Sequence, residues 1–162
     1  MNRVILFSLL LMISMNLHAQ KEQASNRHFW HTDTTSAPAE SIWAIWTDVP
    51  NWKAWDSGLK DASLMGAFVL HAKGEILSLE GRKSSFEIVE YEAGKTYTMK
   101  TRLPLGRLYV KRFLTEENGT TQFTHEVWFA GLSRGLFASA FGKKFRAMLP
   151  DVLDNIKTIA EQ

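Results

Sequence analysis

The spacing of apolar residues changes twice along the chain and divides it into three regions. In residues 36–47 a proline and a glutamate precede apolar positions three or four residues apart, which predicts a helix with one buried face. In residues 59–130, short apolar runs are separated by Gly and Asn, which is typical of antiparallel strands and hairpins. From residue 137 the helical period returns and continues to residue 159. A short aromatic strand at 28–32 and a helical turn at 52–55 complete the predicted order.

Two turns fix the register of the predicted sheet. Asn118-Gly119 is the strongest hairpin signal, because a type I′ turn needs a positive φ at both central residues. A hairpin centred there places Leu114 opposite Phe123, Val110 opposite Val127 and Leu108 opposite Phe129. The same reasoning at Ala93-Gly94 pairs Ile88 with Met99 and Phe86 with Thr101. Both turns therefore predict one curved antiparallel sheet with an apolar inner face.

The carboxyl-terminal region predicts one long amphipathic helix. Its apolar positions are Phe137, Phe141, Phe145, Met148, Leu149, Val152, Ile156 and Ile159. We expect Pro150 to bend this helix, because proline lacks the backbone donor and clashes with the preceding turn.

Residues 1–19 have the pattern of a secretory signal peptide. A positive charge is followed by an apolar run from Val4 to Met15, and Ala19 is the small residue at the expected cut. The run is about a dozen residues long, whereas a membrane-spanning helix needs about 20. We therefore expect residues 1–19 to be removed, residues 20–27 to be flexible, and residues 28–162 to form the domain of a protein exported to the periplasm or secreted. The alternative is that residues 1–19 are not cleaved and act as a membrane anchor.

Composition narrows the functional classes. The chain has 162 residues, with 19 Lys and Arg, 17 Asp and Glu, and no cysteine. The absence of cysteine excludes a disulfide scaffold, a thiolate metal site and a cysteine nucleophile. The nearly balanced charge disfavours nucleic-acid binding, and the 45% hydrophobic content supports one packed globular domain.

Several motifs connect this order of elements to a known group of proteins. They are Ala37-Pro38-Ala39-Glu40-Ser41-Ile42-Trp43, Asp48-Val49-Pro50-Asn51-Trp52, Trp55-Asp56, Phe86-Glu87-Ile88-Val89-Glu90, Leu103-Pro104-Leu105 and Thr124-His125-Glu126-Val127. Together they resemble the SRPBCC superfamily, also called START-like or polyketide cyclase/dehydrase-like proteins, over about residues 28–160. The resemblance implies an α+β helix-grip fold of the START/Bet v 1-like type, with two short helices and a long final helix across a curved sheet. It also implies a cavity that holds a small hydrophobic molecule; some relatives catalyse cyclisation or dehydration there, and many only bind.

The predicted register places Arg112 opposite His125 on the apolar inner face. Burying these groups is costly unless they are hydrogen-bonded. In a functional interpretation, Arg112 holds a ligand carboxylate, phosphate or phenolate, and His125 transfers a proton. The neighbouring cation should lower the pKa of His125 and keep the imidazole neutral near pH 7. In a structural interpretation, a buried Glu or a backbone carbonyl satisfies the pair.

The resemblance and the inward-facing positions give a candidate set of ligand-binding residues. With Arg112 and His125, the set is Trp46, Phe86, Ile88, Tyr97, Met99, Thr101, Phe123, Phe137 and Phe141. Each of these apolar side chains has core packing as its alternative role. Four tryptophans at 43, 46, 52 and 55 either close the cavity or pack the short helices on the sheet.

Other motifs carry less weight. Gly131-Leu132-Ser133-Arg134-Gly135 matches the nucleophile elbow of hydrolases, but no histidine follows it, so we interpret it as a turn before the last helix. We expect no metal site, because histidines 28 and 31 would point to opposite faces of a strand and the sequence has no cysteine or His-Glu cluster. We also expect no cofactor. A basic cluster of Lys143, Lys144 and Arg146 either meets anionic lipid headgroups or is a solvated helix face.

The sequence thus favours an exported module that binds a small hydrophobic molecule, such as a lipid or an aromatic, polyketide-like compound. One alternative is a cofactor-free cyclase or dehydratase with His125 and Arg112 as its catalytic residues. Another is a lipid carrier that meets the membrane surface through the cluster at Lys143.

Overall fold

The computed structural model describes residues 25–162. The predicted signal peptide at 1–19 and residues 20–24 of the predicted flexible segment lie outside the described residues. Arg27 contacts the sheet, because its carbonyl accepts a hydrogen bond of 3.0 Å from the backbone N–H of Phe129. Within the described part of the chain, no helix is long and apolar enough to cross a membrane.

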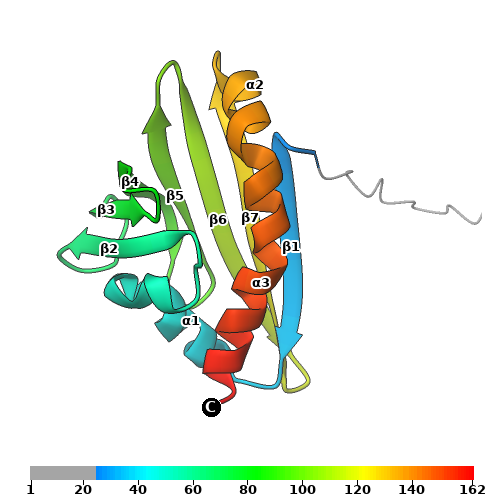
Figure 1. Ribbon diagram of the computed structural model, residues 1–162. Coiled ribbons are helices and arrows are strands. Elements are labelled where there is room, and N and C mark those ends of the chain that lie inside the picture. The colour runs from blue at the N-terminus through cyan, green and yellow to red at the C-terminus, as the bar shows by residue number, and fades with distance from the viewer. Residues whose placement is uncertain (1–24) are drawn as a thin grey trace, which may run out of the picture.

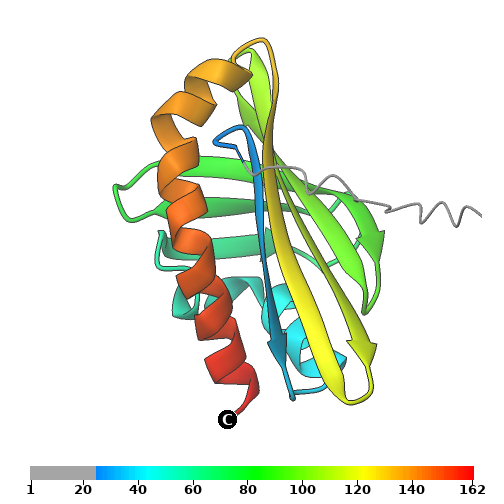
Figure 2. The ribbon, with the colours of Figure 1, turned by 90° about the vertical axis from the view of Figure 1, so that its right-hand side faces the viewer.

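Seven strands form one antiparallel sheet in the order β1-β7-β6-β5-β4-β3-β2. They are β1 (His28–Thr35), β2 (Leu59–Met65), β3 (Lys73–Ser78), β4 (Lys83–Glu92), β5 (Thr96–Leu103), β6 (Gly106–Glu117) and β7 (Thr120–Gly131). The sheet is strongly curved, so that β2, β3 and β4 run across the direction of β1 and β7 (Figure 2). This curvature leaves a concave inner face for the helices to cover.

The hairpin predicted at Asn118-Gly119 is confirmed. Both residues have positive φ angles, 52° and 73°, as the tight turn requires. The register places Arg112 opposite His125 and follows the predicted pairing along the whole hairpin. A two-residue turn of defined twist therefore fixes which side chains of β6 and β7 face inward.

The β4–β5 hairpin departs from the predicted register near its turn. The predicted pairing of Ile88 with Met99 is confirmed, but Glu90 pairs with Thr98, one residue away from the register of a two-residue turn. The shift lies between Ile88 and Glu90, where a β-bulge absorbs the extra residue of a longer loop. Beyond the bulge the two faces of β4 exchange, so Glu90 lies beside Thr98 on the outer face and Tyr91 packs towards the core.

Two short helices follow β1 at one end of the sheet. α1 (Ala39–Thr47) begins after Pro38, and the 3-10 helix η1 (Val49–Ala54) ends next to Trp55. Their tryptophans at 46, 52 and 55 are fully buried against the sheet and the last turns of the final helix. These three rings therefore pack the short helices on the sheet, as in the second interpretation of the tryptophan group.

The predicted carboxyl-terminal helix is confirmed, and it contains an irregular turn that its period does not show. It consists of α2 (Arg134–Phe137), the π-helical turn η2 (Ala138–Gly142) and α3 (Lys143–Ala160). α3 remains α-helical through Pro150, which is exposed, so water can satisfy the carbonyl that loses its donor. Figure 1 shows α3 lying alongside β1, with α2 at the end of the molecule opposite the carboxyl terminus.

Candidate ligand-binding site

A cavity of about 370 Å³ lies between the inner face of the sheet and the carboxyl-terminal helix. The sheet contributes Met99, Thr101, Leu103, Leu108, Val110, Val127 and Phe129 from β5, β6 and β7. The helix contributes Phe137, Phe141, Phe145, Met148, Leu149 and Val152. The walls are therefore mainly apolar, and the volume is within the range of about 300–1,000 Å³ that small-molecule sites occupy.

Arg112 of β6 and His125 of β7 form a polar end of this cavity. Both residues line it, and their exposed fractions are only 3% and 1%. They are direct partners across the two strands, as the hairpin register predicts. Since the surrounding walls are apolar, these two side chains dominate the chemistry at this end.

The Arg112 guanidinium is held by aromatic rings. Its central carbon lies 4.9 Å from the ring of Trp52, 4.8 Å from that of Trp55 and 5.5 Å from that of Tyr97. Nη1 also donates a hydrogen bond to the Tyr97 hydroxyl. Among residues 25–162, no carboxylate forms an ion pair with Arg112, and its Nε has no hydrogen-bond partner. The buried Glu or backbone carbonyl of the structural interpretation is thus replaced by an aromatic cage, which stabilises a cation but does not neutralise it.

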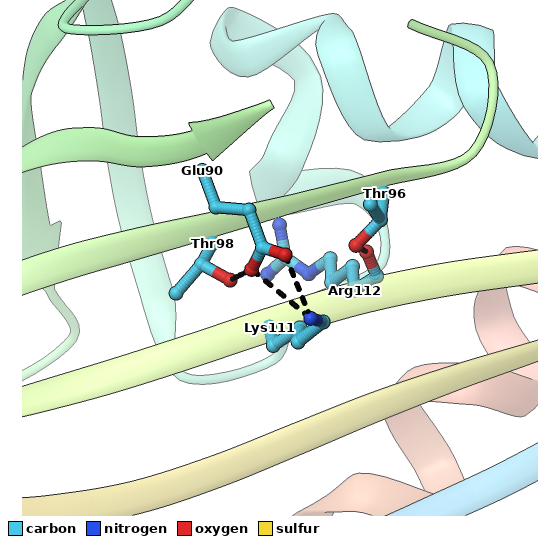
Figure 3. Close-up of polar contacts among 5 residues, drawn as sticks. All are labelled: Glu90, Thr96, Thr98, Lys111 and Arg112. Atoms are coloured by element: carbon cyan, nitrogen blue, oxygen red, sulfur yellow. Dashed lines mark hydrogen bonds and ion pairs between the residues drawn. The ribbon is translucent and has the colours of Figure 1, made fainter. Parts of the chain in front are cut away.

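Contacts on the outer face hold β6 in position at Arg112. Glu90 accepts hydrogen bonds from the Thr98 hydroxyl at 2.6 Å and from Lys111 Nζ at 2.9 Å (Figure 3). Thr96 donates to the backbone carbonyl of Arg112 at 3.0 Å. The hydrogen bond from Thr98, and after it the one from Lys111, lowers the pKa of Glu90. They join β4, β5 and β6 directly behind the guanidinium, whose side chain points to the opposite face from Lys111.

His125 is buried as a neutral imidazole. Burial is the main cause that moves its pKa well below the usual value, and the charges of Arg112 and His31 lower it further. The sequence predicts the direction of this shift but assigns it to the neighbouring cation, which is the second cause. The ring lies 5.5 Å from that of Trp46 and 5.9 Å from that of Trp55. Its Nε2 is buried and has no hydrogen-bond partner among the described residues.

Asp56 is a third polar residue at the cavity, and sequence reasoning missed it. Burial raises its pKa, while a 2.9 Å hydrogen bond from the Gly58 backbone N–H and the charge of Arg112 act in the other direction. Asp56 directly follows the buried Trp55, and this position next to a tryptophan pair was the available signal. The polar end therefore combines a cation held by aromatic rings, a neutral imidazole and a carboxyl group whose pKa is raised by burial.

The structure divides the predicted ligand-binding residues into two groups. The cavity is lined by Met99, Thr101, Arg112, His125, Phe137 and Phe141. Five others do not line it and belong to the core under α1 and η1: Trp46, Phe86, Ile88, Tyr97 and Phe123. The reason is that the buried tryptophans of the short helices fill this half of the concave face. Tyr97 still acts on the site through its contact with Arg112.

The cavity opens between the β3–β4 turn and the helix. Exposed Glu80, Arg82 and Lys144 lie on its rim. Lys144 Nζ donates to Glu80 across the opening at 2.7 Å, and the Arg82 guanidinium lies 5.0 Å from the ring of Phe141. The hydrogen bond from Lys144 is the first cause that lowers the pKa of Glu80 to about 2. Two contacts therefore tie the turn to the helix at the mouth.

Comparison with known families agrees with this geometry. Residues 27–161 match the family model described as polyketide cyclase / dehydrase and lipid transport. The chain belongs to this family. The polyketide cyclase / dehydrase and lipid transport description fits a hydrophobic ligand-binding role for a chain with such a cavity. Among curated proteins, none matches the sequence.

Solved structures show the same fold at low sequence identity. Protein MLL2253 from Mesorhizobium loti is 18% identical with a TM-score of 0.64, over 83% of this chain and 97% of that protein. A hypothetical protein, jhp0584, from Helicobacter pylori is 7% identical with a TM-score of 0.68, over 84% and 89%. Ara h 8.0201 is 9% identical with a TM-score of 0.63, over 83% and 97%. The predicted α+β helix-grip fold and the SRPBCC assignment are thus confirmed.

Proposed function

We propose that this protein binds a small apolar molecule with one anionic or strongly accepting end. The observation that carries the proposal is a buried arginine at the end of an apolar cavity, with no carboxylate paired to it in the described chain. A buried charge is costly to leave without a counter-charge, and a charge-assisted hydrogen bond to a ligand offsets this cost. The polar group of the ligand therefore lies at Arg112 and His125, and its apolar body lies towards Phe137 and Phe141.

Two fluorescent probes that share a ring system test this orientation. Anilinonaphthalene sulfonate carries an anionic group, whereas N-phenyl-1-naphthylamine does not. The sulfonate probe should bind more tightly to the wild-type protein by about tenfold or more, the value of a hydrogen bond to a charged group. Arg112→Gln should remove this difference between the probes. Arg107→Gln is the matched control, because Arg107 lies on the same strand but is exposed and outside the cavity.

The outcomes separate cavity binding from head-group recognition. Thr101→Trp places a large ring in the cavity and should weaken the binding of both probes. If Arg112→Gln and Arg107→Gln affect the sulfonate probe equally, then Arg112 does not recognise the anion. If neither probe binds the wild-type protein, the proposal of an accessible apolar cavity is wrong.

The free Nε2 of His125 beside Arg112 favours a second candidate, a cofactor-free cyclase or dehydratase. A neutral imidazole can accept a proton from a carbon next to a carbonyl, and the guanidinium can stabilise the resulting enolate. Incubation with a linear poly-β-ketone, followed by absorbance of an aromatic product, tests this activity. His125→Gln should abolish turnover and retain binding of the sulfonate probe. No turnover by the wild-type protein would leave the binding proposal as the sole function.

We also propose that the protein is exported, on the pattern of residues 1–19 alone. Amino-terminal sequencing of the protein recovered from cells that express the full-length gene should begin at Gln20. Recovery of the intact amino terminus in the cytoplasmic fraction would contradict export.

A further inference from the structure

Three leucines project into solvent at one end of the molecule. Leu132, Leu105 and Leu136 are 89%, 77% and 70% exposed, the highest values among the large hydrophobic side chains of the described residues. Leu105 lies in the β5–β6 turn, Leu132 in the β7–α2 turn and Leu136 in α2. The turns touch, because the backbone N–H of Ser133 donates to the carbonyl of Leu105 at 3.2 Å. Figure 1 shows both turns and α2 at the end opposite the carboxyl terminus, and we name these three residues the leucine tip.

The backbone at Leu105 is itself unusual. Its φ of 56° lies in the left-handed region. This conformation is unfavourable for any residue with a Cβ atom, whereas glycine adopts it without a steric penalty. The side chain recovers little of this cost, since it is largely exposed. Neither burial nor backbone preference therefore accounts for a leucine at this position. A strained residue that lacks a packing role is a candidate for a function outside the folded core.

The surroundings of the leucine tip are basic. Residues 93–115 and 127–150 contain no Asp or Glu at all. Arg102 and Arg107 pair across β5 and β6 next to the turn, and both are exposed. Arg134 follows Leu132 by two residues and is exposed as well. Within residues 25–162, none of these three arginines has an ion-pair partner.

Acidic residues lie farther from the tip or are already bonded. Glu126, which lies on β7 before the strand reaches the tip, accepts a 2.6 Å hydrogen bond from His28. Glu80 accepts a hydrogen bond from Lys144. Glu116 and Glu117 end β6 at the far side of the molecule, where Figure 1 places the β6–β7 turn near the carboxyl terminus. The charge is therefore segregated, with the positive end at the leucine tip.

The leucine tip is also continuous with the cavity. Leu136 is followed directly by Phe137, which lines the cavity, and Phe141 one turn later lines it too. Lys144, on the rim of the mouth, lies on the next turn of the same helix. A surface that engages the tip would thus lie beside the entrance to the cavity.

We propose that this end of the molecule docks on a lipid bilayer that contains anionic lipids. The leucine tip enters the boundary between headgroups and acyl chains, while Arg102, Arg107 and Arg134 contact the anionic headgroups. A bilayer suits this surface better than a folded protein does, because separate projecting leucines need matching pockets in a protein but not in lipid. The contact goes beyond the proposed function, since it needs no molecule in the cavity. It differs in place from the cluster expected at Lys143, Lys144 and Arg146, of which Lys144 is already paired.

Co-sedimentation with vesicles tests the proposal, using the protein recovered from cells that express the full-length gene. The protein should bind vesicles of phosphatidylcholine with 30% phosphatidylglycerol, in a salt-sensitive manner, and bind pure phosphatidylcholine weakly. Leu132→Gln/Leu136→Gln should lower the partition coefficient by about tenfold or more. Met65→Gln is the matched control, because Met65 is 67% exposed at the end of β2, away from the tip. Leu105→Gly should also weaken vesicle binding without lowering the stability of the fold.

A second pair of variants tests the charges. Arg102→Gln/Arg107→Gln should reduce binding to the anionic vesicles by about tenfold or more, since each arginine near such a surface contributes about fivefold. Lys53→Gln/Lys60→Gln removes the same charge from the η1–β2 region and should have a smaller effect.

Three results would overturn the proposal. They are no salt-sensitive binding of the wild-type protein to anionic vesicles, equal losses in the tip variants and their controls, or a dimer in vesicle-free buffer that dissociates in Leu132→Gln/Leu136→Gln. The last result would assign the tip to a second copy of the chain. Binding of the sulfonate probe should be unchanged in the leucine variants, so failure of this proposal is distinguishable from failure of the cavity proposal.

Discussion

Acidification should destabilise this protein through His125. The imidazole is 1% exposed, and burial, Arg112 and His31 all disfavour its protonated form, so the folded-state pKa lies well below the unfolded value of about 6.5. Below pH 6.5 the unfolded chain therefore binds more protons than the folded one. The free energy of unfolding falls as the pH drops from 6.5 towards the folded-state pKa.

The size of this effect follows from linkage. Well inside this pH window, the stability changes by about 1.4 kcal/mol per pH unit for one group. Between pH 7.5 and pH 5, a histidine that is neutral throughout in the folded protein and has an unfolded pKa of about 6.5 contributes about 2 kcal/mol. This is a large share of the roughly 5–15 kcal/mol that stabilises a domain of ordinary size. Solvent screening does not reduce the figure, because the ring is buried.

Urea unfolding followed by tryptophan fluorescence measures this dependence, since three tryptophans are fully buried near the site. We expect the difference in unfolding free energy between wild type and His125→Gln to change by about 2 kcal/mol from pH 7.5 to pH 5. Asp56 works in the opposite direction, because its raised pKa lets the folded state bind more protons, but the comparison of the two proteins cancels it. If the unfolding free energies of the two proteins changed in parallel with pH, His125 would not be a buried, neutral histidine.

Three further predictions concern the backbone and the cavity mouth. Gly74→Ala should lower the unfolding free energy by about 2 kcal/mol or prevent folding, because a Cβ there would lie 2.3 Å from the Ser63 carbonyl oxygen. Urea unfolding measures this change, and an unchanged midpoint would contradict the close contact. Leu105→Gly should raise the unfolding free energy by about 0.5–1 kcal/mol in the same assay, since it relieves the strain of the left-handed backbone. A loss of stability would show that the leucine side chain packs against the rest of the protein. Glu80→Gln removes the ion pair to Lys144 at the cavity mouth and should speed stopped-flow release of the sulfonate probe with little change in stability; an unchanged release rate would exclude the pair as a barrier.

Local sequence signals predicted the sheet well because they act at short range. The Asn118-Gly119 turn determines the pairing of every residue on β6 and β7, and this placed Arg112 opposite His125. The β4–β5 bulge was missed because turn chemistry alone does not show an extra residue on one strand. The long helix was evident from its period, but the π-helical turn depends on packing rather than on period.

The candidate site was predicted only in part, because it depends on how separate elements share space. Alternation along a strand shows which side chains face inward, but it does not show that Trp52 and Trp55 fill one half of the concave face. Phe86 and Phe123 therefore lie in the hydrophobic core, and the cavity lies nearer to α2 than the sequence predicts. Asp56 was missed because its one signal, the position beside Trp52 and Trp55, does not by itself show that a carboxyl group is buried.

We propose above all that the cavity holds an apolar molecule whose polar end contacts Arg112. Native mass spectrometry of the protein recovered from its own host, followed by extraction and identification of what co-purifies, tests this most directly. We expect a stoichiometric apolar molecule with an acidic or strongly accepting group, which is lost in Arg112→Gln and retained in Arg107→Gln. The mass of the polypeptide alone, both as purified and after incubation with a lipid extract of the host, would contradict it.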